Sequence, residues 1–242
     1  MVIKMIASLI STEFSKVKGN RTFLITAIGA CLIPVMLGII QLFFGGVSLE
    51  SALESTRSFN ITFFFIMFGV LIINYLFTVD VHTRTIKSII PLPVSIGEYI
   101  IGKYLTFVIW MFLLSLISIV SCVVIVAVTG GGFSLNVIIE ASKTFLIATL
   151  LLILVMTPFM FIISLVKNSS GTLLLGVLIA FFNVMGITMF KEAVYSPWAI
   201  PDPLSTGTLT FSNSTALIIV VATFVIGYLL TYWYLSNQDI PL

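Results

Sequence analysis

Long apolar segments separated by short polar ones make up most of this chain. Apolar stretches of roughly 20 residues or more are long enough to cross a bilayer as helices, and lipid offers the backbone no hydrogen-bond partners outside a helix. The pattern predicts six transmembrane helices, at Thr22–Gly45, Phe59–Val79, Tyr99–Val128, Lys143–Val166, Gly171–Phe190 and Thr215–Leu235. The segments between them are too short for a soluble domain of usual size. We therefore expect residues 1–242 to form a single all-α polytopic membrane domain.

Composition and charge support this class and predict an orientation. Only 8% of the residues are charged and 60% are hydrophobic, which is too little charge for the surface of a soluble protein. With the N-terminus inside, Lys and Arg gather on the cytoplasmic side (Lys4, Lys16, Lys18, Arg21, Arg84, Lys87, Lys103 and Lys167) and are fewer outside (Arg57, Lys143 and Lys191). This positive-inside bias and the even number of spans place both termini in the cytoplasm. The net charge of +2 thus reports topology and indicates no nucleic-acid partner.

The segment before the first span has a different pattern. Apolar residues at helical spacing, such as Ile3, Ile6, Ile10 and Phe14, form one face, and polar and basic residues occupy the rest. Residues 1–20 are therefore predicted to form an amphipathic helix that lies in the membrane interface. Two interpretations stay open, a simple positive-inside anchor and a lever that contacts a cytoplasmic partner.

The longest cytoplasmic loop, residues 80–98, mixes charged and apolar side chains. Its first half predicts a short helix that ends at Pro91 and Pro93. A short helix with exposed apolar residues beside charges, held at the membrane surface, is a candidate docking element for a second protein. The alternative is that its apolar side rests on lipid.

The last external segment, residues 191–214, is rich in proline. Because Pro197, Pro201 and Pro203 lie so close together, we expect them to prevent a helix here. Trp198 suits a membrane interface. The segment is either a partly re-entrant external cap or an ordinary surface loop.

The chain contains few residues that support catalysis or nucleotide binding. Gly97–Lys103 fits the first part of a phosphate-loop pattern, but Tyr104 stands where Ser or Thr binds magnesium, and the segment opens a membrane span. A lone His82 cannot form a multi-histidine site, so no metal is expected. The serines of the third span have no histidine or acid at their depth for a nucleophilic triad, so we expect them to bond to their own helix backbone or to a neighbouring helix.

Polar residues within the spans are neutral. Coupled transporters usually place ionisable groups at membrane depth, and the central parts of the six spans have none. Gln41, Asn74 and Asn183 either line a translocation pathway or hydrogen-bond between helices. A neutral pathway suits an amphipathic or lipophilic cargo, with the driving force supplied from elsewhere.

Three features resemble the permease subunits of ABC-2 type ABC transporters. They are the opening pattern Glu13, Lys16, Lys18, the six-span plan with both termini inside, and the loop Asp80…Arg84-Thr85-Ile86-Lys87-Ser88-Ile89-Ile90…Pro93-Val94-Ser95…Gly102-Lys103. Departures from the family pattern are Asp80 for the usual glutamate, Arg84 for a common glycine, and Gly97 for a frequent basic residue.

The resemblance implies function and partners. It implies two copies of a separate ATPase subunit that bind ATP and magnesium, while this chain binds no cofactor. The residues implied to couple to that subunit are Asp80, His82, Arg84, Thr85, Ile86, Lys87, Ile89, Ile90, Glu13 and Lys16. A second permease protomer, identical or homologous, would complete the pathway in the bacterial cytoplasmic membrane, in contact with its lipid.

Short permeases of this kind resemble those of bacteriocin immunity, bacitracin resistance and antimicrobial-peptide export, which implies an amphipathic peptide or drug as the substrate. The alternatives are a permease for another cargo, such as a lipid or an ion, or a non-transporting membrane assembly or sensory protein. A lipid-modifying enzyme is less well supported, because no acid–base constellation is present.

Overall fold

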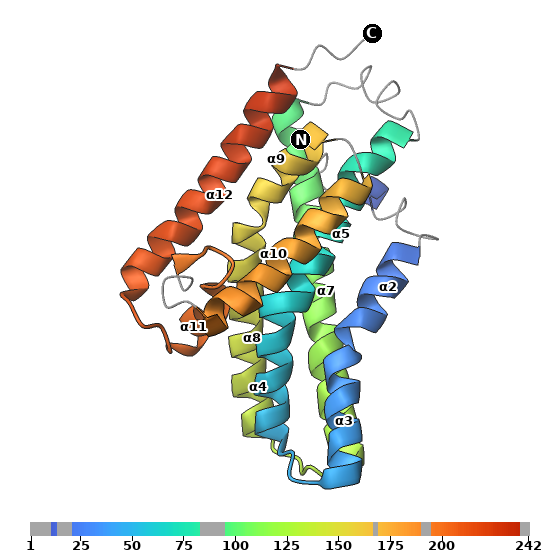
Figure 1. Ribbon diagram of the computed structural model, residues 1–242. Helices are drawn as coiled ribbons and strands as arrows, with labels where there is room; N and C mark the ends of the chain where they lie inside the picture. Colours follow the sequence, from blue (N-terminus) through green and yellow to red (C-terminus); the bar gives the residue numbers. More distant parts are fainter. Residues whose placement is uncertain (1–10, 14–20, 83–94, 167–168, 190–194, 238–242) are drawn as a thin grey trace.

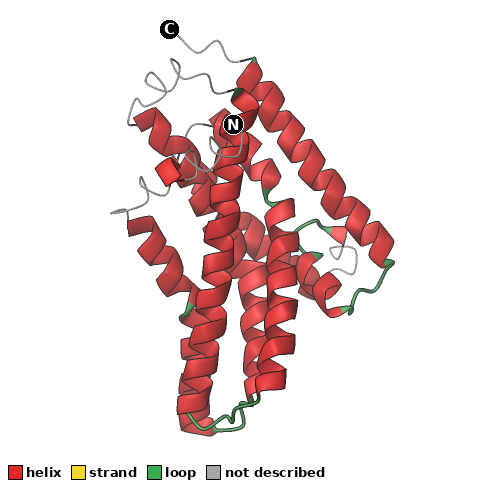
Figure 2. Ribbon diagram, turned by 180° about the vertical axis from the view of Figure 1, so that it is seen from behind, coloured by secondary structure: helices red, strands yellow, loops and turns green. Residues whose placement is uncertain are grey.

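The computed structural model describes residues 11–13, 21–82, 95–166, 169–189 and 195–237, and they form helices and connecting turns, without strands (Figures 1 and 2). The elements in chain order are α2 (Arg21–Ala30), α3 (Leu32–Phe44), α4 (Leu49–Phe59), the π-helix η1 (Asn60–Phe64), α5 (Phe65–His82), α7 (Ile96–Val128), α8 (Leu135–Val155), α9 (Thr157–Val166), α10 (Ser169–Met189), α11 (Pro201–Thr206) and α12 (Asn213–Ser236). The prediction of an all-α fold is confirmed.

Several of these helices are long and apolar enough to cross a membrane. Within the described part of the chain, five stretches meet that requirement: Arg21–Phe44, Leu49–Thr78, Ile96–Val128, Leu135–Val166 and Asn213–Ser236. The fifth predicted span corresponds to α10, which contributes a shorter apolar stretch, Gly171–Gly186. The protein is thus a multi-pass membrane protein, and the count of six spans stays a prediction.

Two helices begin well before the predicted spans. The second span was expected to begin at Phe59, but helix starts at Leu49, where the Ser48 side chain accepts a hydrogen bond from the Ser51 backbone N–H at 3.2 Å. The fourth begins at Leu135 instead of Lys143. Hydropathy marks the part of a helix that suits lipid, whereas the polar extensions are helical because their apolar side packs against protein. In α4 that side is buried against α7 (Leu49, Ala52 and Leu53 against Cys122 and Val126).

Helix α7 lies at the centre of the bundle and packs against α2, α3, α4, α5, α8 and α12. Its Phe107 and Trp110 are fully buried. Phe65 of α5 and Phe145 of α8 meet nearby, with ring centroids 5.9 Å apart. Fully buried aromatic side chains supply much of the packing area in such a core, so α7 is the element against which the others are positioned.

Three of the long helical stretches are interrupted. The first span breaks at Cys31, the second contains the π-helix η1, and the fourth breaks at Met156, two residues before Pro158. Pro158 accounts for the break in the fourth span, because proline interrupts the backbone hydrogen bonds of a helix. Gly227 lets α12 approach this break closely, because a Cβ added at Gly227 would lie 2.6 Å from the Pro158 nitrogen.

Serine and threonine side chains join the helices. Ser118 donates a hydrogen bond to the Ala30 carbonyl at 3.0 Å, at the break in the first span. The hydroxyls of Ser115 and Thr149 lie 3.0 Å apart and link α7 to α8. The expectation that the serines of the third span bond to helix backbones and neighbouring helices is confirmed.

The proline-rich segment contains a helix, so the expectation that its prolines exclude one was wrong. Helix α11 begins at Pro201 and ends at Thr206, and the next residue, Gly207, has a left-handed φ of 71°. Proline is compatible with the first turn, where a backbone N–H has no intrahelical partner in any case. Helix α11 packs on α8 and also contacts η1. It therefore lies beside the bundle, and the ends of α3, α4, α7 and α8 reach beyond it (Figure 1).

Candidate functional site

Lys103 joins three elements at one end of the bundle. Its side chain is 1% exposed, and its ammonium donates a hydrogen bond to Glu13 Oε2 at 3.4 Å. It also donates to the backbone carbonyl of Leu76. The N-terminal segment, the last part of α5 and the first part of α7 are thus connected through one buried cation.

Aromatic rings surround the same ammonium. Lys103 Nζ lies 4.9 Å from the ring centroid of Tyr99 and 5.5 Å from that of Phe77. Both rings are within cation–π distance, and such contacts strengthen where water is excluded. A carboxylate, a carbonyl and two ring faces together replace the water that a buried lysine loses.

A capping box at the start of α7 determines which face of the helix Lys103 occupies. Ser95 and Glu98 form a capping box, in which the Glu98 carboxylate accepts from the Ser95 N–H at 2.8 Å and the Ser95 hydroxyl accepts from the Glu98 N–H at 3.3 Å. With α7 starting there, Tyr99 and Lys103 are four residues apart and share one face. The glycines of the phosphate-loop-like segment lie within this helix. That backbone forms no loop around a phosphate, and Lys103 is directed into the protein.

The structure describes only some of the predicted coupling residues. Glu13 lies at the Lys103 junction and is 8% exposed. Asp80 and His82 lie in the last turn of α5, although their side chains are outside the described residues. The rest of the set is outside them altogether: Lys16, Arg84, Thr85, Ile86, Lys87, Ile89 and Ile90. Their coupling role stays a prediction.

Two of the three predicted pathway residues make contacts that position backbone and helices. The side-chain oxygen of Asn74 accepts from the Thr172 hydroxyl at 3.0 Å, which joins α5 to α10. The side-chain oxygen of Gln41 accepts from the Val47 N–H at 2.6 Å and closes the turn after α3. These contacts agree with the structural alternative, and the pathway role itself is untested.

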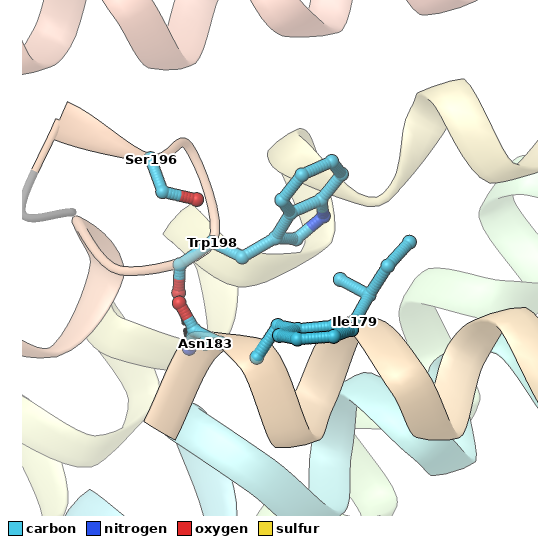
Figure 3. A pocket seen from close by; sticks show the side chains of 5 residues that line it. Ile179, Asn183, Ser196 and Trp198 are labelled. Atoms are coloured by element: carbon cyan, nitrogen blue, oxygen red, sulfur yellow. Dashed lines mark hydrogen bonds between the residues drawn. The ribbon is translucent and has the colours of Figure 1, made fainter. Parts of the chain in front are cut away.

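Asn183, the third, links α10 to both η1 and the segment before α11. Its amide nitrogen donates to the Thr62 carbonyl at 3.0 Å and to the Trp198 carbonyl at 3.3 Å. Asn183 also lines a pocket with Ile179, Phe182, Ser196 and Trp198 (Figure 3). Its side-chain oxygen is buried and has no hydrogen-bond partner.

Sequence reasoning missed two polar contacts away from the Lys103 junction. Arg57 Nε donates to Asp202 Oδ1 at 2.8 Å, with the side chains 11% and 15% exposed, which ties α4 to α11. The signal was faint, since each was one of a few charges in segments expected to be loops. Asn60 is fully buried and donates to Ser118 Oγ at 3.0 Å. It was overlooked because the predicted span began at Phe59, which put Asn60 at the membrane surface.

Taken together, these features define a multi-pass protein of the cell membrane whose buried polar groups connect helices. Among the residues that the structure describes, no group of His, Cys, Asp and Glu is placed to hold a metal ion. Residues 9–186 match the family model of the ABC-2 family transporter protein. The chain is also 30% identical, over 178 residues, to the bacitracin transport permease protein BCRB of Bacillus licheniformis, an alignment that covers 72% of this chain and 84% of that protein. The chain belongs to the ABC-2 transporter family, as one of its permeases.

Proposed function

We propose that this chain is the transmembrane subunit of an ATP-driven exporter. It moves an amphipathic peptide or drug-like molecule across or out of the membrane while a separate ATPase subunit hydrolyses ATP. Family membership supports the permease role. The bacitracin transport named for the relative supports a peptide cargo.

The Lys103 junction is the observation that carries this proposal. Residues 83–94, which belong to the predicted coupling loop, connect the end of α5 to the start of α7 in the chain. Lys103 binds α5 and α7 to each other and to the N-terminal segment through Glu13 and the Leu76 carbonyl. A partner that displaces the loop or the N-terminal segment would therefore move α5 and α7 together instead of one helix alone.

The mechanism follows from this connection. Two ATPase subunits, each holding ATP and magnesium, would bind at the cytoplasmic face and close on nucleotide binding. The predicted topology, six spans with both termini inside, would put the Lys103 junction at that face. Because α7 packs against six other elements, its displacement would shift the bundle between two arrangements of its helices. A second permease protomer would form the other wall of the pathway.

Reconstitution tests the proposal. The purified chain is inserted into lipid vesicles alone, or together with its co-purified ATPase subunit, and ATP-dependent movement of fluorescently labelled bacitracin is measured. We expect movement only when both subunits and hydrolysable ATP are present. Uphill movement by the chain alone would refute an external energy source, and a complex that hydrolyses ATP without moving any amphipathic peptide would favour an assembly or sensory role.

A further inference from the structure

A small pocket lies between α10 and the segment that precedes α11. Ile179, Phe182 and Asn183 come from α10, and Ser196 and Trp198 come from the facing segment (Figure 3). Its volume is about 160 Å³. An apolar protein cavity of about 150 Å³ accommodates benzene, so the pocket holds one ring-sized or branched apolar group but no large molecule.

The pocket contains a buried acceptor without a partner. Asn183 is 7% exposed, and its Oδ1 has no hydrogen-bond partner. The orientation of this amide is determined, because its nitrogen must face the Thr62 and Trp198 carbonyls. The oxygen is thus the polar atom that Asn183 offers to the pocket. The indole Nε1 of Trp198 is also buried without a partner.

Such unpaired atoms are few. Within the described chain only three buried side-chain atoms lack a partner, and two of them belong to residues that line this pocket. Native proteins satisfy most buried polar groups. One unpaired acceptor and one unpaired donor at the same pocket therefore match a ligand that carries both a donor and an acceptor.

The walls determine what else the ligand carries. Ile179, Phe182 and Trp198 are apolar, and among the residues that the structure describes no charged side chain lines the pocket. The Phe159 ring packs against the Trp198 indole, with centroids 5.7 Å apart, and holds it in position. The ion pair of Arg57 and Asp202 anchors the neighbouring α11. The pocket is thus preformed, and it favours an uncharged group because a charge there would lose its hydration without compensation.

We propose that this pocket binds one apolar side chain of an amphipathic peptide together with its adjacent backbone amide. The amide N–H donates to Asn183 Oδ1, a carbonyl accepts from Trp198 Nε1, and the side chain packs between Ile179, Phe182 and Trp198. This inference rests on the peptide cargo of the proposed function and assigns a recognition site to it.

Photolabelling of the purified chain in lipid nanodiscs tests the site. The probe is N-acetyl-photoleucinamide, whose diazirine side chain inserts into nearby residues on irradiation, and mass spectrometry locates the adducts. We expect saturable adducts in peptides that contain residues 179–183 and 195–198. Excess N-acetyl-leucinamide should suppress them at least tenfold. N-acetyl-N-methyl-leucine dimethylamide, which keeps the side chain but has no N–H, should not.

Matched variants separate the pocket from nonspecific labelling. Ile179→Trp fills the pocket without removing either hydrogen bond of Asn183 and should abolish the adducts. Leu178→Trp adds the same bulk at the neighbouring position on α10, where the side chain is 40% exposed, and should leave them unchanged. Asn183→Leu removes the acceptor and should weaken labelling about tenfold. Wild-type-like labelling of Ile179→Trp would overturn the proposal.

Two further outcomes would also overturn it. One is scattered adducts on exposed helix faces with no competition, which would mean that the probe reports lipid partitioning only. The other is equal competition by both leucine derivatives, which would show that Asn183 accepts no hydrogen bond from the ligand. Because the assay contains no ATPase subunit or ATP, the site and the transport function can fail independently.

Discussion

The carboxylate of Glu13 and the ammonium of Lys103 meet at 3.4 Å inside the protein, although 90 positions separate them in the chain. Lys103 is 1% exposed, and its hydrogen bond to the Leu76 carbonyl holds it against α5 at the same time. The N-terminal segment is therefore attached to the helices on both sides of the predicted coupling loop. If that loop is the site of ATPase docking, the N-terminal segment moves with it.

Lys103→Met should destabilise the protein by about 3–5 kcal/mol, because it removes one partner of a buried ion pair. The double variant Lys103→Met with Glu13→Gln should recover part of this loss, since both charges of the pair are then removed together. Thermal unfolding in detergent, followed by size-exclusion chromatography, measures the stability of the single and the double variant.

The control for this comparison is Lys143→Met. Lys143 pairs with Glu140 at 3.0 Å, but the two side chains are 62% and 75% exposed, and exposed pairs contribute about 0–1 kcal/mol. The stability lost by the double variant is compared with the sum of the losses in the single variants Lys103→Met and Glu13→Gln. If the two values are equal, the two residues are not energetically coupled.

Separating Arg57 from Asp202 should loosen the attachment of α11 to α4. A hydrogen bond to a charged group contributes about 1.5–3 kcal/mol, so Arg57→Gln or Asp202→Asn should expose residues 195–212 to protease about tenfold more often. Limited proteolysis of the reconstituted protein measures the rate of cleavage within residues 195–212. The exchange Arg57→Asp with Asp202→Arg should restore protection, and continued sensitivity of the exchanged protein would contradict a role for the ion pair.

Gly227→Ala should be poorly tolerated. The added Cβ would lie 2.6 Å from both the Pro158 nitrogen and the Thr157 hydroxyl, so α12 must move away from α9 at a cost of about 1–3 kcal/mol. Gly97→Ala is the matched control, since its added Cβ meets nothing closer than Tyr232 at 3.9 Å. We expect a lower melting temperature for Gly227→Ala only, and equal melting temperatures would argue against close packing of α9 and α12.

Replacing both Arg84 and Lys87 with Glu should weaken association with the ATPase subunit, because the charges of the predicted docking loop are reversed. Membrane insertion should be unaffected. Co-purification with a tagged ATPase subunit measures association, and membrane fractionation measures insertion. Lys143→Glu, placed at the far end of the predicted topology, is the control. Unchanged co-purification of the double variant would count against docking at this loop.

The hydropathy pattern identified most of the helices but not their full lengths. The segment from Leu49 to Ser58 was expected to be an external connection and is helical. Its Glu50, Glu54 and Arg57 lower the hydropathy of the segment without preventing a helix whose other side packs on α7. The proline-rich segment was misjudged for a related reason, because proline terminates a helix only when it lies beyond the first turn.

Long apolar runs and scarce charge were sufficient for the membrane class and the all-α fold, because these properties depend on local composition and on the solvent that each segment meets. The family was indicated by a resemblance, carried by Glu13, Lys16 and Lys18 and by the loop motif from Asp80 to Lys103. The buried partners depended on the tertiary structure. Glu13 with Lys103, Arg57 with Asp202, and Asn183 with Trp198 are contacts between different elements. No pattern within one segment specifies which distant side chain fills a position at a helix interface, since the packing of the whole bundle brings the two residues together.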